Sequence, residues 1–371
     1  MRITAAVSRA SGAPLSIEPL ELDDPREDEV LVEVAACGVC HTDLTMRDMD
    51  QLTPKPVVLG HEGAGVVLAV GRAVRDVEPG DHVVMSYDYC GACHCCRTQA
   101  PFYCDDALPM NFGGLRPDGS ARSRGVDGPV GGSIFGQSAF ATHALCTERN
   151  LVKVSRDLPM ETLGPLGCGV ETGAGAVMNV LRPRPEDTLA VFGVGGVGMS
   201  AVMAAAALGV SRIIAVDVNP ERLALARELG AHDIVDARDG RSAEALLDLT
   251  SGGVDHALDA TANAKATEAA IAVLAPRGSL CLTAASRERI SLNARHMMLG
   301  GRRLMGAVQG EAISKTFIPK LIALHLQGRF PFDRLLTPYP LAQINQALAD
   351  AETGAVLKPL IRMSSPSVTA T

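Results

Sequence analysis

The chain has 371 residues, 47% of them hydrophobic, and a formal net charge of −8. A chain of this length can bury its own cores, most simply as two domains, and does not need disulfides to compensate for small size. Acidic and basic residues are spread along the chain, which argues against binding to a nucleic-acid backbone. The first residues lack the apolar run of a secretion signal, which predicts a cytoplasmic protein with reduced cysteines.

The N-terminal part of the chain predicts a mainly β domain. Short apolar runs at residues 29–37, 63–70 and 81–86 alternate with turn residues such as VEPGD at 77–81, a pattern typical of strands. Residues 105–138 are rich in glycine, proline and serine without a clear period, which predicts a long loop.

A different pattern begins near residue 188. Strand-like runs at 188–193, 212–218, 232–237 and 254–260 are each followed by a helix-like run, and SLCLTA at 279–284 adds a further strand. Repeated βα units predict an α/β fold with a doubly wound parallel sheet.

The C-terminal part returns to mixed structure. We expect one helix at residues 314–328 and another at 341–352, because both segments have a helical period. The tail at 364–371 is rich in serine and threonine and is predicted to be disordered.

Residues 189–210 carry no charge over about the length of a membrane-spanning helix. Within this stretch, however, Gly193, Gly195, Gly196 and Gly198 follow a short β-prone run and precede an alanine-rich run. Such dense glycine favours a buried strand, a tight turn and a helix over one spanning helix.

The same glycines form Gly193-x-Gly195-x-x-Gly198, which is typical of a dinucleotide-binding βαβ unit. Asp217, at the end of the next strand, can accept hydrogen bonds from the ribose of NAD and would repel the 2′-phosphate of NADP. Arg222 could attract that phosphate, but Asp217 lies closer in the motif, so the sequence predicts NAD. A glycine-rich turn that binds no nucleotide is the alternative.

The stretch YCGACHCCRTQAPFYC at 89–104 is a second motif. Its C-x2-C-x2-C-x7-C spacing comprises Cys90, Cys93, Cys96 and Cys104. Four thiolates so spaced can surround one Zn²⁺ tetrahedrally and leave no open position for a substrate, so we expect a structural zinc lobe at about 88–106. Cys95 and His94 are then spare, and a redox-active CxxC pair is the alternative.

Three further groups are too far apart in the sequence for spacing alone to join them. They are Cys40-His41-Thr42-Asp43, Gly60-His61-Glu62 and Gly167-Cys168-Gly169. A single cysteine or histidine in an apolar stretch is more often a core residue than a metal ligand.

A resemblance joins these groups. The stretches GVCHTDL, GHEGAGVV, VEPGDHVV, CGACHCC with Cys104, LGPLGCGVETGAGAV and FGVGGVG follow one another in the order seen in a known family. The chain thus resembles, over nearly its whole length, the zinc-dependent alcohol dehydrogenases of the medium-chain dehydrogenase/reductase superfamily. The stretches NFGG, FGQSAFATHAL, RNLVKV and FIPKLIALHLQGRFPFDRLL most resemble the NAD-dependent aryl-alcohol (benzyl alcohol) dehydrogenases.

The resemblance implies a GroES-like catalytic domain at residues 1–165 and 306–371, with a Rossmann domain at 166–305 inserted into it. It also implies a catalytic zinc ion held by Cys40, His61 and Cys168, with Glu62 beside it as a transient ligand. With the structural lobe, the expected content is about two zinc ions per chain.

Further roles follow from the resemblance. Thr42 would take the alcohol proton and pass it to the nicotinamide ribose, and Asp43 would orient His61, although a helix cap is the alternative for Asp43. Thr45 stands where many relatives have a histidine that ends the proton path, so the path would end on water or another base. The residues expected to bind NAD are His41, Thr172, Gly193, Gly195, Gly196, Val197, Gly198, Asp217, Arg222 and Lys358. Those expected near the substrate are Ser86, Tyr87, Asn111 and Phe112, and packing against the structural lobe is the alternative for Tyr87 and Phe112.

The implied reaction interconverts a primary benzylic or allylic alcohol and its aldehyde by hydride transfer to NAD, in a homodimer or homotetramer without a membrane or nucleic-acid partner. A terpenoid (geraniol-type) alcohol dehydrogenase is the alternative. A zinc-stapled scaffold or redox sensor would need neither Asp217 nor the His61-Glu62 pair. A zinc-free reductase of the same superfamily would lack the ligands at 40, 61 and 168.

Overall fold

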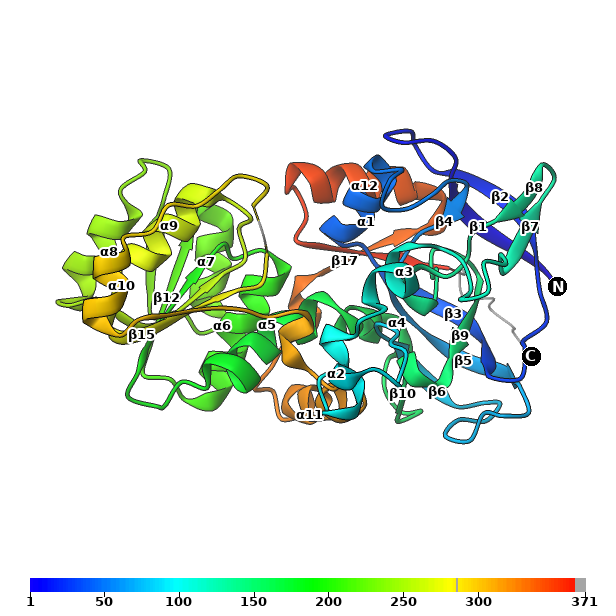
Figure 1. Ribbon diagram of the computed structural model, residues 1–371, viewed down its shortest axis with the longest axis horizontal. Helices are drawn as coiled ribbons and strands as arrows, with labels where there is room; N and C mark the ends of the chain where they lie inside the picture. Colours follow the sequence, from blue (N-terminus) through cyan, green and yellow to red (C-terminus); the bar gives the residue numbers. More distant parts are fainter. Residues whose placement is uncertain (285, 364–371) are drawn as a thin grey trace, which may run out of the picture. The chain divides into compact units, whose positions relative to one another are not determined.

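The computed structural model describes residues 1–284 and 286–363, so the tail for which we predict disorder lies outside the described residues. The chain divides into two compact units (Figure 1). The first contains Met1–Cys168, Ile313–Pro319 and the described residues from Leu335 on, and the second contains Gly169–Ala312 and Lys320–Arg334. This division gives Lys320–Arg334 to the second unit, whereas the expected catalytic domain includes that segment.

The first unit is built on two sheets. One has the strand order β4-β1-β2-β7-β8. Its strands are β1 (Arg2–Ser8), β2 (Ser16–Leu22), β4 (Val57–Val58), β7 (Ser123–Gly125) and β8 (Gly128–Val130). The other has the order β10-β6-β5-β3-β18-β17, with β9 paired to β3. Its strands are β3 (Glu29–Gly38), β5 (Glu62–Val70), β6 (His82–Met85), β9 (His143–Thr147), β10 (Leu151–Val154), β17 (Leu336–Pro340) and β18 (Lys358–Arg362).

Short helices connect these strands. They are α1 (His41–Asp48), α2 (His94–Arg97), α3 (Ala107–Phe112), α4 (Met160–Leu163) and α12 (Ile344–Thr353). A longer helix, α11 (Ser314–Leu326), contributes residues to both units. One common core contains apolar side chains of these strands, such as Val32 and Leu145, and the neighbouring Phe140. The apolar runs of the sequence thus form the buried faces of the strands.

The segment 105–138 is more ordered than the long loop that we expected. It contains α3 and the β7–β8 hairpin, in which Ser123 pairs with Val130. Two of its arginines are buried against one carboxylate: Arg116 Nε donates to Glu29 Oε1 at 2.8 Å, and Arg122 Nε donates to the same oxygen at 3.2 Å. These long-range ion pairs hold a segment that has no apolar period of its own.

The second unit contains a parallel sheet in the order β13-β12-β11-β14-β15-β16. Its strands are β11 (Thr188–Phe192), β12 (Arg212–Asp217), β13 (Asp233–Asp236), β14 (Val254–Asp259), β15 (Leu274–Leu282) and β16 (Arg303–Gly306). Its helices are α5 (Gly169–Gly175), α6 (Gly196–Leu208), α7 (Pro220–Glu228), α8 (Ser242–Thr250), α9 (Ala264–Ala272) and α10 (Ala294–Gly300). The strand order reverses direction next to β11, as a doubly wound sheet requires, which confirms the predicted fold class.

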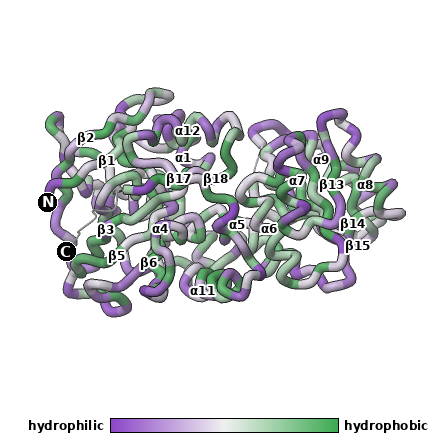
Figure 2. The backbone as a smooth tube through the Cα atoms, turned by 180° about the vertical axis from the view of Figure 1, so that it is seen from behind, coloured by the Kyte–Doolittle hydropathy of each residue, from purple (hydrophilic) through white to green (hydrophobic). Residues whose placement is uncertain are grey.

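The charge-free stretch at 189–210 forms β11, a turn and α6, as predicted. In Figure 2 the tube around α6 is mainly green to pale, which agrees with the alanine-rich sequence of that helix. None of the helices in the described residues has both the length and the apolar composition needed to cross a membrane.

Candidate active site and metal centres

Three element ends in the first unit bring together the dispersed residues that the resemblance joined. Cys40 precedes α1, His61 precedes β5, and Cys168 follows a short 3-10 helix at Gly164–Gly167. One ligand atom from each of these residues and one from Glu62 lie within 4.8 Å of one another. Three of the four residues are buried, namely His61, Glu62 and Cys168. An ionised side chain without a partner would therefore cost free energy here.

Asp43 makes the contacts that both of its expected roles require. One carboxylate oxygen, Oδ2, accepts from the backbone NH of Cys40 at 2.9 Å and so caps α1. The other, Oδ1, lies 2.9 Å from His61 Nδ1 and 3.2 Å from the backbone N of Gly60. Because Asp43 occupies Nδ1, the other imidazole nitrogen is left to face a ligand.

The cluster fits a zinc ion. The Nε2 atom of His61 is buried and has no hydrogen-bond partner among the described residues. The pKa of Cys40 is lowered well below its usual value, chiefly by a hydrogen bond from Cys168, and that bond raises the pKa of Cys168. Two adjacent thiols cannot both ionise without a cation, so two sulfurs and an unpartnered imidazole nitrogen form a donor set suited to Zn²⁺.

Lys358 is buried beside Glu62, and its expected contact with NAD stays a prediction. Its Nζ donates to Glu62 Oε1 at 2.7 Å, to Glu62 Oε2 at 2.8 Å and to the carbonyl of Val39 at 3.2 Å. These contacts join the ammonium to Glu62 and to the backbone next to Cys40. Burial raises the pKa of Glu62 to about 7 although Lys358 lowers it.

The four spaced cysteines converge as the motif predicts. The sulfur atoms of Cys90, Cys93, Cys96 and Cys104 lie within 4.8 Å of one another. Backbone NH groups point at them: those of Cys90 and Cys96 lie 3.3 Å and 3.4 Å from the sulfurs of Cys104 and Cys93. Such donors stabilise thiolates, and four thiolates fit a closed tetrahedral zinc site.

Cys95 lies outside this group of four. We therefore expect Cys95→Ser to keep the full zinc content and the melting temperature of the parent protein. In contrast, Cys96→Ser should lose about one zinc ion per chain and melt earlier, since a structural zinc site contributes to folding. Elemental analysis after gel filtration, with a thermal melt, measures both. Zinc loss in Cys95→Ser would refute the ligand set.

The glycine motif in the second unit has the geometry of a dinucleotide loop. A Cβ on Gly198 would lie 1.9 Å from the carbonyl oxygen of Gly193, so only glycine allows α6 to begin so close to β11. A Cβ on Gly195 would meet only Arg222, whose Nη1 lies 4.0 Å from it. Asp217 Oδ2 accepts from the backbone N of Val194 at 2.7 Å. The acid, the arginine and the glycine turn are thus brought together within the unit.

The remaining polar residues named from the resemblance differ in their surroundings. Thr42 Oγ1 lies 3.8 Å from the sulfur of Cys40, and Thr172 Oγ1 donates to Gln309 Oε1 at 3.2 Å. His41 is exposed at the start of α1. Thr45 is also exposed, and its hydroxyl donates to the carbonyl of His41 at 3.2 Å.

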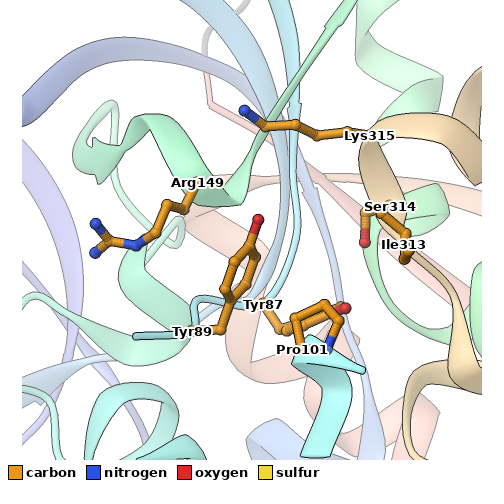
Figure 3. A pocket seen from close by; sticks show the side chains of 7 residues that line it. All are labelled: Tyr87, Tyr89, Pro101, Arg149, Ile313, Ser314 and Lys315. Carbon is orange, nitrogen blue, oxygen red and sulfur yellow. The ribbon is translucent and has the colours of Figure 1, made fainter. Parts of the chain in front are cut away.

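The residues that we expected near the substrate fall into different places. Asn111 Oδ1 accepts from the backbone N of Asp88 and its Nδ2 donates to the carbonyl of Asp88, both at 2.9 Å. Its place near the substrate stays a prediction. Tyr87 lines a small pocket with room for about one water molecule. Figure 3 shows this pocket with the side chains of Tyr89, Arg149 and Lys315, and the catalytic cluster contributes none of its lining residues.

Ser86 and Phe112 lie closer to the cluster. The Ser86 hydroxyl donates to the carbonyl of Gly167 at 2.7 Å, next to Cys168. Phe112 contacts the ring of Phe135 edge-on at 5.3 Å between centroids, and Phe135 in turn lies 4.5 Å from the imidazole of His61.

Sequence reasoning missed two neighbours of His61. Phe135 contacts the imidazole ring, and Gln137 bonds the backbone around it. Both belong to FGQSAFATHAL, a stretch that entered the sequence analysis only as a mark of resemblance. The turn FGQS, at the end of a glycine-rich segment without a periodic pattern, was the one sequence feature that could have marked these residues for attention.

Comparisons with known proteins agree with this geometry. Residues 26–156 match the family "Alcohol dehydrogenase GroES-like domain", and residues 196–325 match "Zinc-binding dehydrogenase". Geraniol dehydrogenase of Castellaniella defragrans is 44% identical over 361 residues, covering 96% of each chain. The chain belongs to the zinc-dependent medium-chain alcohol dehydrogenases.

Solved structures place this alcohol dehydrogenase among close structural relatives. Benzyl alcohol dehydrogenase from Acinetobacter calcoaceticus is 41% identical with a TM-score of 0.95, covering 98% of this chain and 100% of that one. An alcohol dehydrogenase zinc-binding domain protein from Burkholderia ambifaria is 48% identical with a TM-score of 0.96, with the same coverage. These matches confirm the predicted family and fold.

Proposed function

We propose that this alcohol dehydrogenase interconverts primary alcohols and aldehydes whose reacting carbon is bonded to an unsaturated carbon, with NAD as the hydride acceptor. The relatives named above support this class: geraniol is an allylic alcohol and benzyl alcohol is benzylic. The observation that carries the proposal is the cluster of Cys40, His61 and Cys168 with the rings of Phe135 and Phe112 on the imidazole side. It combines zinc-binding donors with apolar, aromatic surroundings, which agree with substrates of this class.

In this proposal Cys40, His61 and Cys168 hold a catalytic zinc ion, and Cys90, Cys93, Cys96 and Cys104 hold a structural one. When bound, zinc supplies a Lewis acid that lowers the pKa of an alcohol, and NAD supplies the hydride acceptor. A scaffold or redox sensor would need only the second group, and a zinc-free reductase would need neither.

The protein's own residues have defined tasks in the reaction. The Thr42 hydroxyl, beside Cys40, receives the alcohol proton. Asp43 keeps the proton of His61 on Nδ1, so that Nε2 presents its lone pair. Lys358 neutralises the buried Glu62, which limits the negative charge around the two cysteines.

The NAD preference rests on Asp217, whose carboxylate lies at the glycine turn. A carboxylate there accepts hydrogen bonds from a ribose diol and repels a 2′-phosphate. His41, Thr172, Val197, Arg222 and the motif glycines complete the proposed cofactor contacts. Lys358 is a further proposed contact, with the pyrophosphate.

The experiment compares matched alcohols by NADH formation: geraniol against citronellol, benzyl alcohol against cyclohexylmethanol, and 1-butanol. We expect the unsaturated member of each pair to have the higher kcat/KM, because conjugation stabilises the developing carbonyl. The ratio of geraniol to benzyl alcohol separates a terpenoid from an aromatic preference, and a parallel series with NADP tests the cofactor. Equal turnover within both pairs would refute the substrate class.

The end of the proton path gives a second test. The Thr45 hydroxyl donates to the His41 carbonyl and is not a base at neutral pH. A histidine at this position could accept the proton and release it to solvent. We therefore expect Thr45→His to raise turnover by up to about tenfold and to make turnover less sensitive to buffer concentration. Thr45→Ala is the matched control and should behave like the parent. A deuterated alcohol identifies whether hydride transfer limits turnover. With hydride transfer not limiting, an unchanged rate and buffer dependence in Thr45→His would contradict the idea.

We also propose that the enzyme works in the cytoplasm as a homodimer or homotetramer, with small alcohols and aldehydes as its partners. Light scattering coupled to gel filtration distinguishes these two assemblies from a monomer of 38.7 kDa.

A further inference from the structure

The segment 134–140 lies directly against the segment that carries His61. The backbone N of Ala139 donates to the carbonyl of Gly60 at 2.8 Å, and that of Phe140 donates to Leu59 at 3.0 Å. The hydroxyl of Ser138 donates to the carbonyl of Val58 at 2.7 Å. The carbonyls of residues 58–60 therefore all accept hydrogen bonds from this one segment.

Gln137 extends this contact past the histidine. Its side chain is fully buried. Its Nε2 donates to the carbonyl of His61 at 2.9 Å, and its Oε1 accepts from the backbone N of Gly63 at 3.0 Å. One amide thus fixes the backbone on both sides of Glu62, and an aliphatic side chain could make neither bond.

Phe135 restrains the imidazole itself. The two ring centroids lie 4.5 Å apart at an interplanar angle of 31°. Phe135 has φ 49° and ψ 33°, a left-handed conformation that is uncommon for a bulky residue. Buried side chains hold it there: Asn150 Nδ2 donates to the Phe135 carbonyl at 3.0 Å, and Arg122 Nη1 donates to that of Gly136 at 2.8 Å.

We propose that Gln137 and Phe135 are positioning residues that hold His61 in its metal-binding orientation before a metal arrives. This inference rests on the proposed catalytic zinc site. Asp43 fixes Nδ1, Phe135 covers one face of the ring, and Gln137 fixes the backbone. Only Nε2 then remains without a hydrogen-bond partner among the described residues. One imidazole nitrogen of His61 lies within 4.8 Å of the sulfur atoms of Cys40 and Cys168. Strained backbone that surrounding residues maintain is a common feature of such sites.

The test measures how fast zinc leaves the intact protein when a chromogenic chelator is added in excess. In Gln137→Met and Phe135→Leu, we expect about one zinc ion per chain to leave roughly 10–100 times faster than in the parent, as with other residues that support a metal ligand. The zinc bound by the four cysteines should leave at the parent rate and so serves as an internal reference. The visible spectrum of cobalt-substituted protein should change for the catalytic site alone.

Two variants control for a general loss of stability. Asn345 bonds the backbone N and carbonyl of Leu15 with its amide, as Gln137 does around Glu62, so Asn345→Leu removes an equivalent pair of bonds. Phe330→Leu removes a buried ring that contacts Phe332 in the second unit. Both should release zinc at the parent rate. The proposal would be overturned if a control released zinc as fast as its matched variant, that is, Asn345→Leu as fast as Gln137→Met or Phe330→Leu as fast as Phe135→Leu. It would also be overturned if both test variants released zinc at a rate within twofold of the parent.

Phe135→Gly keeps the test decisive if the other variants do not fold. Glycine adopts a left-handed backbone without strain, so this variant should fold while lacking the ring, and it should still lose zinc quickly. His61→Ala, measured in parallel, separates the two proposals. If His61→Ala has the zinc content of the parent, the proposed catalytic site itself is wrong. If it lacks one zinc ion and Phe135→Gly keeps zinc as the parent does, only the positioning role fails.

Discussion

Cys168→Ser is expected to reduce kcat/KM by roughly three orders of magnitude and to remove about one zinc ion per chain, because Lewis-acid assistance is worth several kcal/mol. A serine hydroxyl is not ionised at neutral pH, so the change replaces an anionic sulfur donor by a neutral oxygen. Cys40 and His61 would remain, but two donors bind zinc much more weakly than three. The measurements are steady-state NADH formation and elemental zinc analysis of the same sample.

The matched control for this variant is Cys281→Ser, which changes a buried cysteine on β15 that belongs to neither group of metal-binding residues. It should keep both the zinc content and most of the activity. A Cys168→Ser protein with full zinc content and parent activity would show that the metal, if catalytic, is bound elsewhere.

Glu29→Gln is expected to lower stability by about 3–5 kcal/mol, the usual cost of removing one partner from a buried ion pair. Glu29 accepts hydrogen bonds from Arg116 at 2.8 and 3.0 Å and from Arg122 at 3.2 Å, and all three side chains are at most 4% exposed. A neutral amide would leave the buried guanidinium of Arg122 without the counter-charge of Glu29 and leave Arg116 with Asp23 as its remaining acidic partner. The melting temperature should fall by about 10 °C, since each kcal/mol corresponds to a few degrees in a domain of this size.

The same carboxylate predicts a pH effect. Burial raises the pKa of Glu29, but the hydrogen bond from Arg116 and the charge of Arg122 outweigh it, so the pKa in the folded protein lies below its usual value of 4.5. The resulting stabilisation is fully present above pH 4.5 and is lost as the pH falls through the lowered pKa. Melting curves should therefore show that the difference between the parent and Glu29→Gln is constant above this pH and shrinks below it.

Glu27→Gln is the control for this second prediction. Glu27 pairs with Arg72 on the surface, where both side chains are more than 60% exposed, and such pairs contribute little. Its melting temperature should match that of the parent. If Glu29→Gln melts at the same temperature as Glu27→Gln, the buried ion cluster does not stabilise the 105–138 segment.

Local patterns of the sequence were sufficient for the parallel sheet and the four-cysteine group. The βα repeat after residue 188 and the glycine turn depend on neighbours a few residues apart, and the structure has the corresponding elements β11, α6 and β12. The cysteines of the lobe lie within 15 residues, so their spacing nearly fixes how they can converge. For the dispersed trio, spacing was uninformative, and only the resemblance joined its members.

The sequence by itself therefore determined the fold class, the family and the residue types available for metal and cofactor binding. The tertiary structure decided the partners of individual polar side chains. Lys358 pairs with Glu62, which is 296 residues away. Glu29 organises a segment about 90 residues further along the chain, and Gln137 supports His61 across 76 residues. Hydrogen bonds and ion pairs of this kind follow from how strands are paired, so they have no signature in local composition or periodicity.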